Sequence, residues 1–442
     1  MAGTIPSDTT LAPAPSLGAL LRAFWKIGWL SFGGPVGQIA LMHRELVDDR
    51  RWVSEPQFLA ALNFCHLLPG PEAQQLATYI GWKLHGLRGG LAAGLLFVIP
   101  GAAVMLALSL LYWSAARLDW FAMLFLGIKA AVIAIVIQAL IRIGRRALTS
   151  GFQRVVAVVA FAALYLFALP FPLVVLGAGA AGALAVSVRP GWLKLHAYDP
   201  AGLAPRPGLG RTLATVGGCL LLWAAPLLLV LALLGPHHVL WQVGIFFSKL
   251  AVVSFGGAYA VLAYMAQQAV QTHQWLSAGE MADGLGLAET TPGPLILVTQ
   301  FVGFLAGARG TGGLAGGIAA ALLTTWVTFS PCFLWIFTFA PWIERLQASK
   351  RLAGALAAIT AAIVGVIANL SLWFALHVLF ARVAEVQSGP VRTLLPELAS
   401  FDWRAGVLAA VAGVLLIGFK RGVLLTLAVC AAGGLAMRVA GL

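Results

Sequence analysis

The sequence predicts an all-α polytopic membrane protein made of two inverted-topology repeat units with broken or re-entrant helices. Three observations lead to this fold class. Of the 442 residues, 61% are apolar and only 10% carry charge, and the mean hydropathy is +0.93. The tetrapeptide SFGG occurs at residues 31–34 and again 223 residues later, at 254–257. Basic residues follow the first copy but not the second, which indicates that the two copies face opposite sides of a membrane.

The composition excludes an ordinary soluble domain, in which about a quarter of the residues carry charge. Apolar runs near the ~20 residues needed to cross a bilayer occur throughout the chain. Because backbone groups in lipid must be hydrogen-bonded internally, these runs are expected to form α-helices. The formal net charge of +13 comes from short basic stretches between the apolar runs. This pattern sets membrane topology, and we prefer that interpretation to nucleic-acid binding.

The repeat extends well beyond the tetrapeptide, at the same spacing and without a gap. Apolar composition alone does not place a lysine, Gly clusters and Pro clusters at the same spacing in both copies. The matching features are Lys26 and Lys249, Trp52 and Trp275, the PGP sequences at 69–71 and 292–294, and the GGL sequences at 89–91 and 312–314. The chain is therefore predicted to be a duplicated membrane unit that includes helix breakers and a cation.

Between the two SFGG copies, five apolar runs are long enough to cross the membrane. Because five is odd, the second unit enters inverted, provided that the SFGG and PGP segments make no net crossing. Gly-Gly and Pro-Gly-Pro interrupt the apolar runs, so half-inserted helices are expected there. The alternative, in which each SFGG segment spans fully, makes the units parallel; we prefer inversion. The five runs cover approximately residues 90–113, 120–141, 152–169, 171–188 and 212–234.

The charged loops give the expected topology and domain plan. Arg44, Arg50 and Arg51 follow the first SFGG, whereas residues 267–279 contain no Lys or Arg. The positive-inside rule then places the N-terminus, the 189–211 segment and the loop at 344–351, which includes Arg345, in the cytoplasm and the C-terminus outside. The start of the chain lacks the pattern of a cleavable signal peptide. The plan is a flexible tail at 1–20, a first transporter repeat at 21–188, a Pro-rich cytoplasmic linker at 189–211 and a second repeat at 212–442.

The SFGG elements are candidates for an anion site. An ionisable side chain at membrane depth usually faces a cavity, and a helix that restarts at glycine exposes unpaired N–H groups and a positive dipole end. Two inverted copies converge near the midplane on one doubly charged oxyanion. The competing interpretations are lysines that reach the lipid interface and glycines that only allow close packing. The candidates are Lys26, Ser31, Gly33, Gly34, Lys249, Ser254, Gly256 and Gly257.

The PGP elements are predicted tips or hinges of helical hairpins, because proline cannot continue a helix. The two copies diverge beside the tips, since His66 corresponds to Glu289 and Glu72 to Leu295. Such asymmetric ionisable groups suit proton coupling, although they could instead only satisfy hairpin backbone groups. The hydroxyls of Thr290 and Thr291 are candidate donors to the anion. The predicted coupling or gating residues are His66, Pro69, Gly70, Pro71, Glu72, Glu289, Pro292, Gly293 and Pro294.

The sequence lacks the motifs of several other functions. There is no nucleotide phosphate loop, no HExxH sequence and no cysteine or histidine cluster for a metal, an iron–sulfur cluster or haem. Cys65, Cys219, Cys332 and Cys430 each lie alone in apolar sequence and are expected to be core residues. The chain is therefore expected to need no cofactor and not to be an enzyme. A membrane oxidoreductase and an ion channel remain the alternatives from other classes.

The paired motifs resemble the chromate ion transporter family, in its long two-domain form. The resemblance covers both units: SFGGP at 31–35 and PGP at 69–71 in the first, SFGG at 254–257 and TPGP at 291–294 in the second. It implies antiparallel halves in a bacterial inner membrane and export of chromate driven by the proton motive force, conferring resistance. Sulfate, the structural analogue, is the alternative substrate, and a homodimer is a further expectation. Ala258 replaces Pro35 in the second copy, so the two glycine breaks need not be equivalent.

Overall fold

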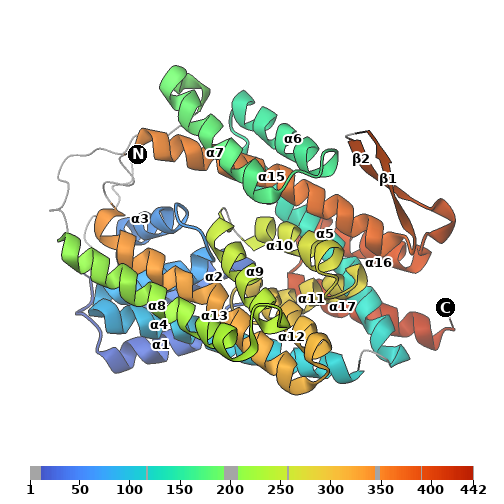
Figure 1. Ribbon diagram of the computed structural model, residues 1–442, viewed down its shortest axis with the longest axis horizontal. Helices are drawn as coiled ribbons and strands as arrows, with labels where there is room; N and C mark the ends of the chain where they lie inside the picture. The colour runs from blue at the N-terminus through green and yellow to red at the C-terminus, as the bar shows by residue number, and fades with distance from the viewer. Residues whose placement is uncertain are drawn as a thin grey trace, which may run out of the picture.

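The computed structural model describes residues 11–115, 118–193, 208–255, 258–343, 349–389 and 391–441 (Figure 1). Residues 1–10 of the predicted tail, residues 194–207 of the predicted linker, Arg345, Gly256 and Gly257 lie outside this part. The first unit contains α1 (Leu17–Leu30), α2 (Gly34–His43), the π-helix η1 (Arg44–Asp49), α3 (Glu55–Cys65), α4 (Glu72–Ala115), α5 (Asp119–Ala147), α6 (Gly151–Tyr165) and α7 (Phe171–Val188).

The second unit repeats this order after α8 (Leu209–Leu234), a helix that precedes the second SFGG element. Six helices of the described residues are long and apolar enough to cross a membrane. The second unit contains α9 (Val239–Val253), α10 (Ala258–Gln267), the π-helix η3 (Gln268–Thr272), α11 (Ala278–Thr290), η4 (Leu295–Leu297), α12 (Val298–Thr311), α13 (Leu314–Phe339), α15 (Lys350–Leu379), α16 (Trp403–Gly413), η7 (Val414–Gly418) and α17 (Val423–Val439). The predicted all-α membrane fold with repeats is confirmed.

The repeat holds at the level of local geometry. Ser54 and its repeat partner Ser277 both begin a helix with a capping box, in which a side chain three residues later returns the hydrogen bond. Arg51 and its partner Gln274 both adopt a left-handed conformation with φ of 52°, which is uncommon for residues other than glycine. Each lies between a π-helix and one of the repeat-equivalent tryptophans, Trp52 or Trp275. The two copies therefore share their irregular features as well as their helices.

Each unit contains two helical hairpins, one at its SFGG segment and one at its PGP segment. In α1, Lys26 contacts Glu45 of η1 across the SFGG break, so the chain turns back instead of continuing in the same direction. In the second unit, Arg309 at the end of α12 contacts Glu280 at the start of α11 and donates to the carbonyl of Trp275. The PGP segment therefore forms the tip of a hairpin that enters and leaves on one side. The SFGG and PGP segments make no net crossing, as predicted.

The long helix α4 contains a reversal at His85 and Gly86, where the backbone leaves helical values. A side chain at Gly81 would overlap the backbone of Gly89, and Thr78 lies against Gly94. Residues 72–84 and 87–115 are therefore antiparallel neighbours, like α12 and α13 in the second unit. Only the second part, residues 87–115, is a full crossing.

This reversal also fixes the relative orientation of the units. His85 Nε2 lies 2.6 Å from the carbonyl oxygen of Pro15, so α1 starts on the side where α4 reverses. From that reversal the chain crosses through residues 87–115, α5 and α8, with the helix pair α6 and α7 adding no net change of side. Three crossings are an odd number, so α9 starts on the opposite side from α1. The units are inverted, as the charge bias predicts.

The outer helices of the two units are interlocked. α15 of the second unit packs against α6 and α7 of the first, and α5 of the first packs against α16 and α17 of the second (Figure 1). Small residues permit the close approach, since a Cβ at Gly434 would overlap the backbone of Met123. One addition was not predicted: an antiparallel hairpin of β1 (Val383–Ser388) and β2 (Val391–Pro396) follows α15.

Candidate functional site

The tips of the hairpins from the two units meet and exchange backbone hydrogen bonds. Gly293 of the second PGP donates its N–H to the carbonyl of Ser31, at 2.9 Å. Gly70 of the first PGP donates to the carbonyl of Ser254, at 2.8 Å. Because each bond is the repeat image of the other, the two units are related here by an approximate two-fold axis. We call this region, residues 31–38, 69–75, Ser254, Phe255 and 291–294, the central crossing.

Glycine is required at the two tips for both conformation and space. Gly70 and Gly293 have φ of 122° and 85°, values that favour glycine. A Cβ at Gly70 would lie 2.8 Å from Gln75 Nε2 and 2.9 Å from Cys332 Sγ. The second tip packs on the spanning part of α4, where a Cβ at Gly101 would overlap the carbonyl oxygen of Pro292. The prolines on either side keep each tip outside its helices and leave the glycine N–H free for the other unit.

The N-terminus of α2 opens into free space at the central crossing. Gly33 and Gly34 have φ of 83° and 68°, and a Cβ at either position would meet nothing within 4 Å. No side chain caps this end of the helix among the described residues. Its first N–H groups and the positive end of its dipole are therefore available to an anion. One turn later, Gln38 donates to the carbonyl oxygen of Gly293 at 2.6 Å and fixes the helix against the second tip.

Several buried amide groups around the tips lack a partner among the described residues. Both polar atoms of Gln74 are in this state, although the side chain is fully buried in the first turns of α4. Gln75 donates to the carbonyl oxygen of Pro69 at 2.6 Å, and its own Oε1 is unpaired within the described part. A buried amide without a hydrogen-bond partner costs about 1–3 kcal/mol, so both glutamines are candidates for binding a polar ligand near the tips.

Lys26 and Lys249 occupy repeat-equivalent positions but have different surroundings. Lys26 lies 2.5 Å from the buried carboxylate of Glu45, which Arg50 also approaches at 3.5 Å. The repeat partners of Glu45 and Arg50 are Gln268 and His273. Both lysines are exposed, but Lys249 has no carboxylate partner among the residues that the structure describes. The second unit thus presents an unneutralised cation where the first presents an ion pair.

Comparison with known proteins agrees with this architecture. The model of the Chromate transporter family matches residues 18–183 and 241–435, one segment in each unit. The chain belongs to the chromate transporter family. It is 35% identical over 374 residues to a chromate transport protein of Pseudomonas aeruginosa, covering 82% of each chain. It is 29% identical over 414 residues to a probable chromate transport protein of Synechococcus elongatus, covering 91% of this chain and 96% of that one. No solved structure matches the chain significantly.

In this chromate transporter family member, the ionisable groups flanking the first tip lie together. His66 Nδ1 is 3.0 Å from Glu72 Oε1, so these residues bridge the two arms of the first hairpin. Glu289, the repeat partner of His66, is buried at the end of α11. The hydroxyls of Thr290 and Thr291 donate to carbonyl groups one turn earlier in α11, so in this conformation they face their own helix. Their hydroxyl protons are therefore used within α11 and are not available to an anion in this conformation.

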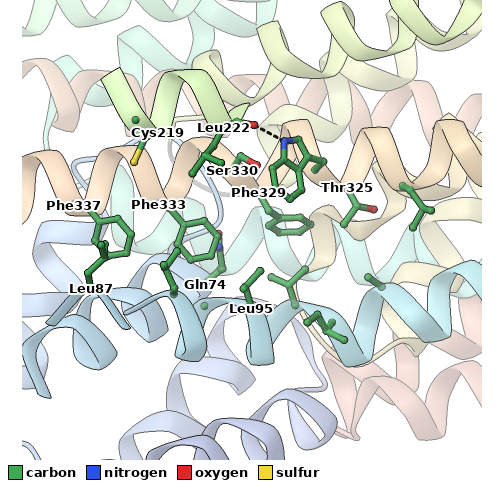
Figure 2. A pocket seen from close by; sticks show the side chains of 18 of the residues that line it. Gln74, Leu87, Leu95, Cys219, Leu222, Thr325, Phe329, Ser330, Phe333 and Phe337 are labelled. Atoms are coloured by element: carbon green, nitrogen blue, oxygen red, sulfur yellow. Dashed lines mark hydrogen bonds between the residues drawn. The ribbon is translucent and has the colours of Figure 1, made fainter. Parts of the chain in front are cut away.

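The buried amide of Gln74 also lines an apolar groove of about 930 Å³ (Figure 2). It runs between α4, α8 and α13, and Trp326 of α13 donates to the carbonyl of Leu222 on α8 at 3.0 Å. Phe333 and Phe337 line its wall. Apolar side chains offer a divalent anion neither hydrogen bonds nor opposite charge, so we assign this groove to the lipid-facing side of the fold.

Sequence reasoning alone did not find Gln38 or Glu45. Gln38 is one helical turn into α2, and the available signal is a polar residue within the apolar sequence that precedes His43. Glu45 lies 19 residues after Lys26, beyond any helical spacing, and only the reversal at SFGG brings the two together.

Proposed function

We propose that this chromate transporter family member is a secondary active transporter that exports chromate from the cytoplasm across the inner membrane. The proton motive force drives export, and the cell gains chromate resistance. The observation that carries the proposal is the central crossing, where hairpin tips from opposite sides meet beside an uncapped helix N-terminus. The substrate is bound and released without chemical change, and no cofactor takes part.

Chromate binds between the two SFGG elements. The free N–H groups at Gly33 and Gly34 are the main donors to the dianion. Gly256 and Gly257, which lie outside the described residues, are their repeat partners and are proposed for the same role. Ser31 and Ser254 hold the tips in place, and Lys26 and Lys249 supply positive charge at the two approaches. Lys26 is roughly 7 to 8 Å along the helix axis from Ser31, at 1.5 Å per residue. Thr290 and Thr291 join the site when α11 moves.

Alternating access follows from the inverted arrangement. The first unit's hairpins open to one side and the second unit's to the other, and their tips share the same two hydrogen bonds. Rocking of one pair of hairpins relative to the other exposes the centre to one side at a time. Pro69, Gly70, Pro71, Pro292, Gly293 and Pro294 act as the hinges of this motion, and His66, Glu72 and Glu289 respond to protons.

We place the N-terminus in the cytoplasm and the C-terminus in the periplasm. Arg142, Arg145 and Arg146 lie at the end of α5, on the side where α1 begins, and the positive-inside rule assigns that side to the cytoplasm. The pair Lys350 and Arg351, at the start of α15, lies on the same side.

A sulfate or other oxyanion permease is the second candidate. Chromate and sulfate are tetrahedral dianions of similar size, and a site made of N–H groups and lysines attracts both. Uptake of each anion into inside-out vesicles, with imposed pH and voltage gradients, separates the candidates. Exported chromate appears as uptake that an acidic vesicle interior drives against its gradient. Downhill flux alone indicates a channel, and sulfate uptake in right-side-out cells without chromate export indicates the permease.

Glu289→Gln is expected to alter the pH dependence of chromate transport, because it removes a buried titratable group next to the second tip while keeping its shape. The measurement is the initial rate of chromate uptake into inside-out vesicles from pH 6 to 8, about one unit on either side of neutrality. Glu397→Gln, at an exposed carboxylate paired with Arg382, is the matched variant and keeps the pH profile of the unmodified protein. An unchanged profile for Glu289→Gln assigns this residue to structure alone.

A further inference from the structure

A second ionic cluster lies inside the helical bundle, away from the central crossing. Asp283 of α11 is almost fully buried, with 6% of its side chain exposed. One carboxylate oxygen is 3.2 Å from Lys129 Nζ of α5, and the other accepts a hydrogen bond from the Tyr112 hydroxyl of α4 at 2.6 Å. The cluster joins a hairpin arm of the second unit to two spanning helices of the first.

The duplicated fold does not need this cluster. The repeat partners of Asp283, Lys129 and Tyr112 are Ala60, Leu352 and Trp335, so the corresponding place in the other half has no ionic pair. Both halves nevertheless form the same helices and hairpins. Burying an ion pair at membrane depth is expensive, and a residue that packs well often replaces one without loss of stability. A cluster present in one unit only is therefore better explained by a task that only one unit performs.

The position of Asp283 connects it to the moving parts. α11 leads from Asp283 through Thr290 and Thr291 to Gly293, which donates to Ser31 at the centre. α11 also packs closely on α5, since a Cβ at Gly286 would overlap the side chain of Ile128. A displacement of the hairpin relative to α5 would separate Asp283 from Lys129. A lone carboxylate in a low-dielectric interior binds a proton in preference to remaining charged.

Partly exposed polar groups lie between the cluster and the side where α11 begins. Glu280, one turn before Asp283, pairs with Arg309 of α12 at the mouth of the hairpin, and both are partly exposed. Lys129 retains 24% exposure, and its Nζ lies 3.5 Å from the position of a Cβ on Gly279. Two further helices, α15 and α17, also pack on α11. Their charged and histidine side chains lie near the helix ends, at Lys350, Arg351, His377 and Arg438, and the Cys430 thiol lies in the middle of α17.

We propose that Asp283 is a proton-carrying group of the transport cycle, in addition to the ionisable groups beside the tips, and that its ion pair with Lys129 and its protonated form exclude one another. Water on the Glu280 side delivers a proton to the Asp283 carboxylate when the hairpin leaves α5. The return of Lys129 displaces that proton toward the opposite side. Protonation is thereby linked to the position of the second hairpin, which in turn shapes the central crossing. This inference rests on the proposed proton-driven transport.

The test uses purified full-length protein in proteoliposomes and two assays. The first is accumulation of labelled chromate driven by a pH gradient, and the second is exchange of labelled for unlabelled chromate with no gradient. Asp283→Asn is expected to lose accumulation above the equilibrium level and to retain exchange, because the site binds the anion but no longer couples it to protons. Glu397→Gln, at an exposed carboxylate paired with Arg382, is the matched control and keeps both activities.

The outcomes are distinct. Gradient-driven accumulation by Asp283→Asn at the level of the unmodified protein overturns the inference. Loss of both activities in a folded variant also overturns it, because the residue then serves architecture or substrate binding. If Asp283→Asn does not fold, the double variant Lys129→Met/Asp283→Asn removes both charges together and is expected to exchange without accumulation. Absence of gradient-driven accumulation in the unmodified protein contradicts the proposed function itself, and the inference with it.

Discussion

Gly101→Ala is expected to reduce chromate transport at least tenfold and to lower the melting temperature of the purified protein. Alanine normally stabilises a helix over glycine by about 1 kcal/mol. At this position a Cβ would overlap the carbonyl oxygen of Pro292 and lie 2.6 Å from Leu297 Cδ1. The contact is with backbone, so relief requires the second tip to move, and overpacking of this kind costs about 1–3 kcal/mol. Displacement of the tip breaks the hydrogen bond from Gly293 to Ser31.

Gly177→Ala is the matched control. Gly177 lies in α7, and a Cβ there meets nothing within 4 Å. This variant is expected to transport chromate normally, with unchanged or slightly higher thermal stability. Transport and melting temperature are measured for both variants in the same detergent and vesicle preparations. Normal flux in Gly101→Ala would mean that close packing of the second tip on α4 is unimportant for transport.

Lys249→Ala is expected to abolish measurable transport while the protein stays folded and inserted. Lys249 has no carboxylate partner in the described residues, so its charge is available to the dianion. A hydrogen bond to a charged group contributes about 1.5–3 kcal/mol, which is about 10- to 100-fold in affinity. Lys26→Ala is also expected to abolish transport, but with lower thermal stability, because it leaves the buried Glu45 with only the longer contact to Arg50.

The control for charge is Lys249→Arg, which keeps the cation and is expected to retain partial flux. Initial rates of chromate uptake into inside-out vesicles are compared at equal amounts of inserted protein. The melting temperature distinguishes the two alanine variants, because only Lys26→Ala is expected to lower it. Near-normal flux in both alanine variants would remove the lysines from the mechanism. Near-normal flux in Lys249→Ala alone would show that the ion-paired lysine, not the unpaired one, attracts the anion.

The repeat made much of the fold predictable from sequence. Glycine and proline clusters at a fixed spacing mark hairpin tips, because they act through local backbone geometry that survives any tertiary context. The inversion also followed, since charge bias and crossing number depend only on sequence. The reversal at Gly86 was harder to see, because a single glycine in an apolar run does not distinguish a turn from a helix.

The chemistry of the site was less predictable. The pairing of Lys26 with Glu45 depends on a reversal and a π-helix, and the reciprocal bonds of Gly70 and Gly293 depend on how the two units dock. Asp283 and Lys129 escaped notice for a further reason: neither has an ionisable repeat partner, so a search guided by duplication passes over them. Contacts that form only when the two units dock could therefore not be predicted from the repeat.

An experimental structure of the protein with bound chromate tests the central claim most directly. We expect anion density at the N-terminus of α2, within hydrogen-bonding distance of the backbone N–H groups that follow Gly33, with the tips at Gly70 and Gly293 beside it. Anion density confined to the loops or to the groove under α8, with the α2 N-terminus empty at saturating chromate, would contradict it.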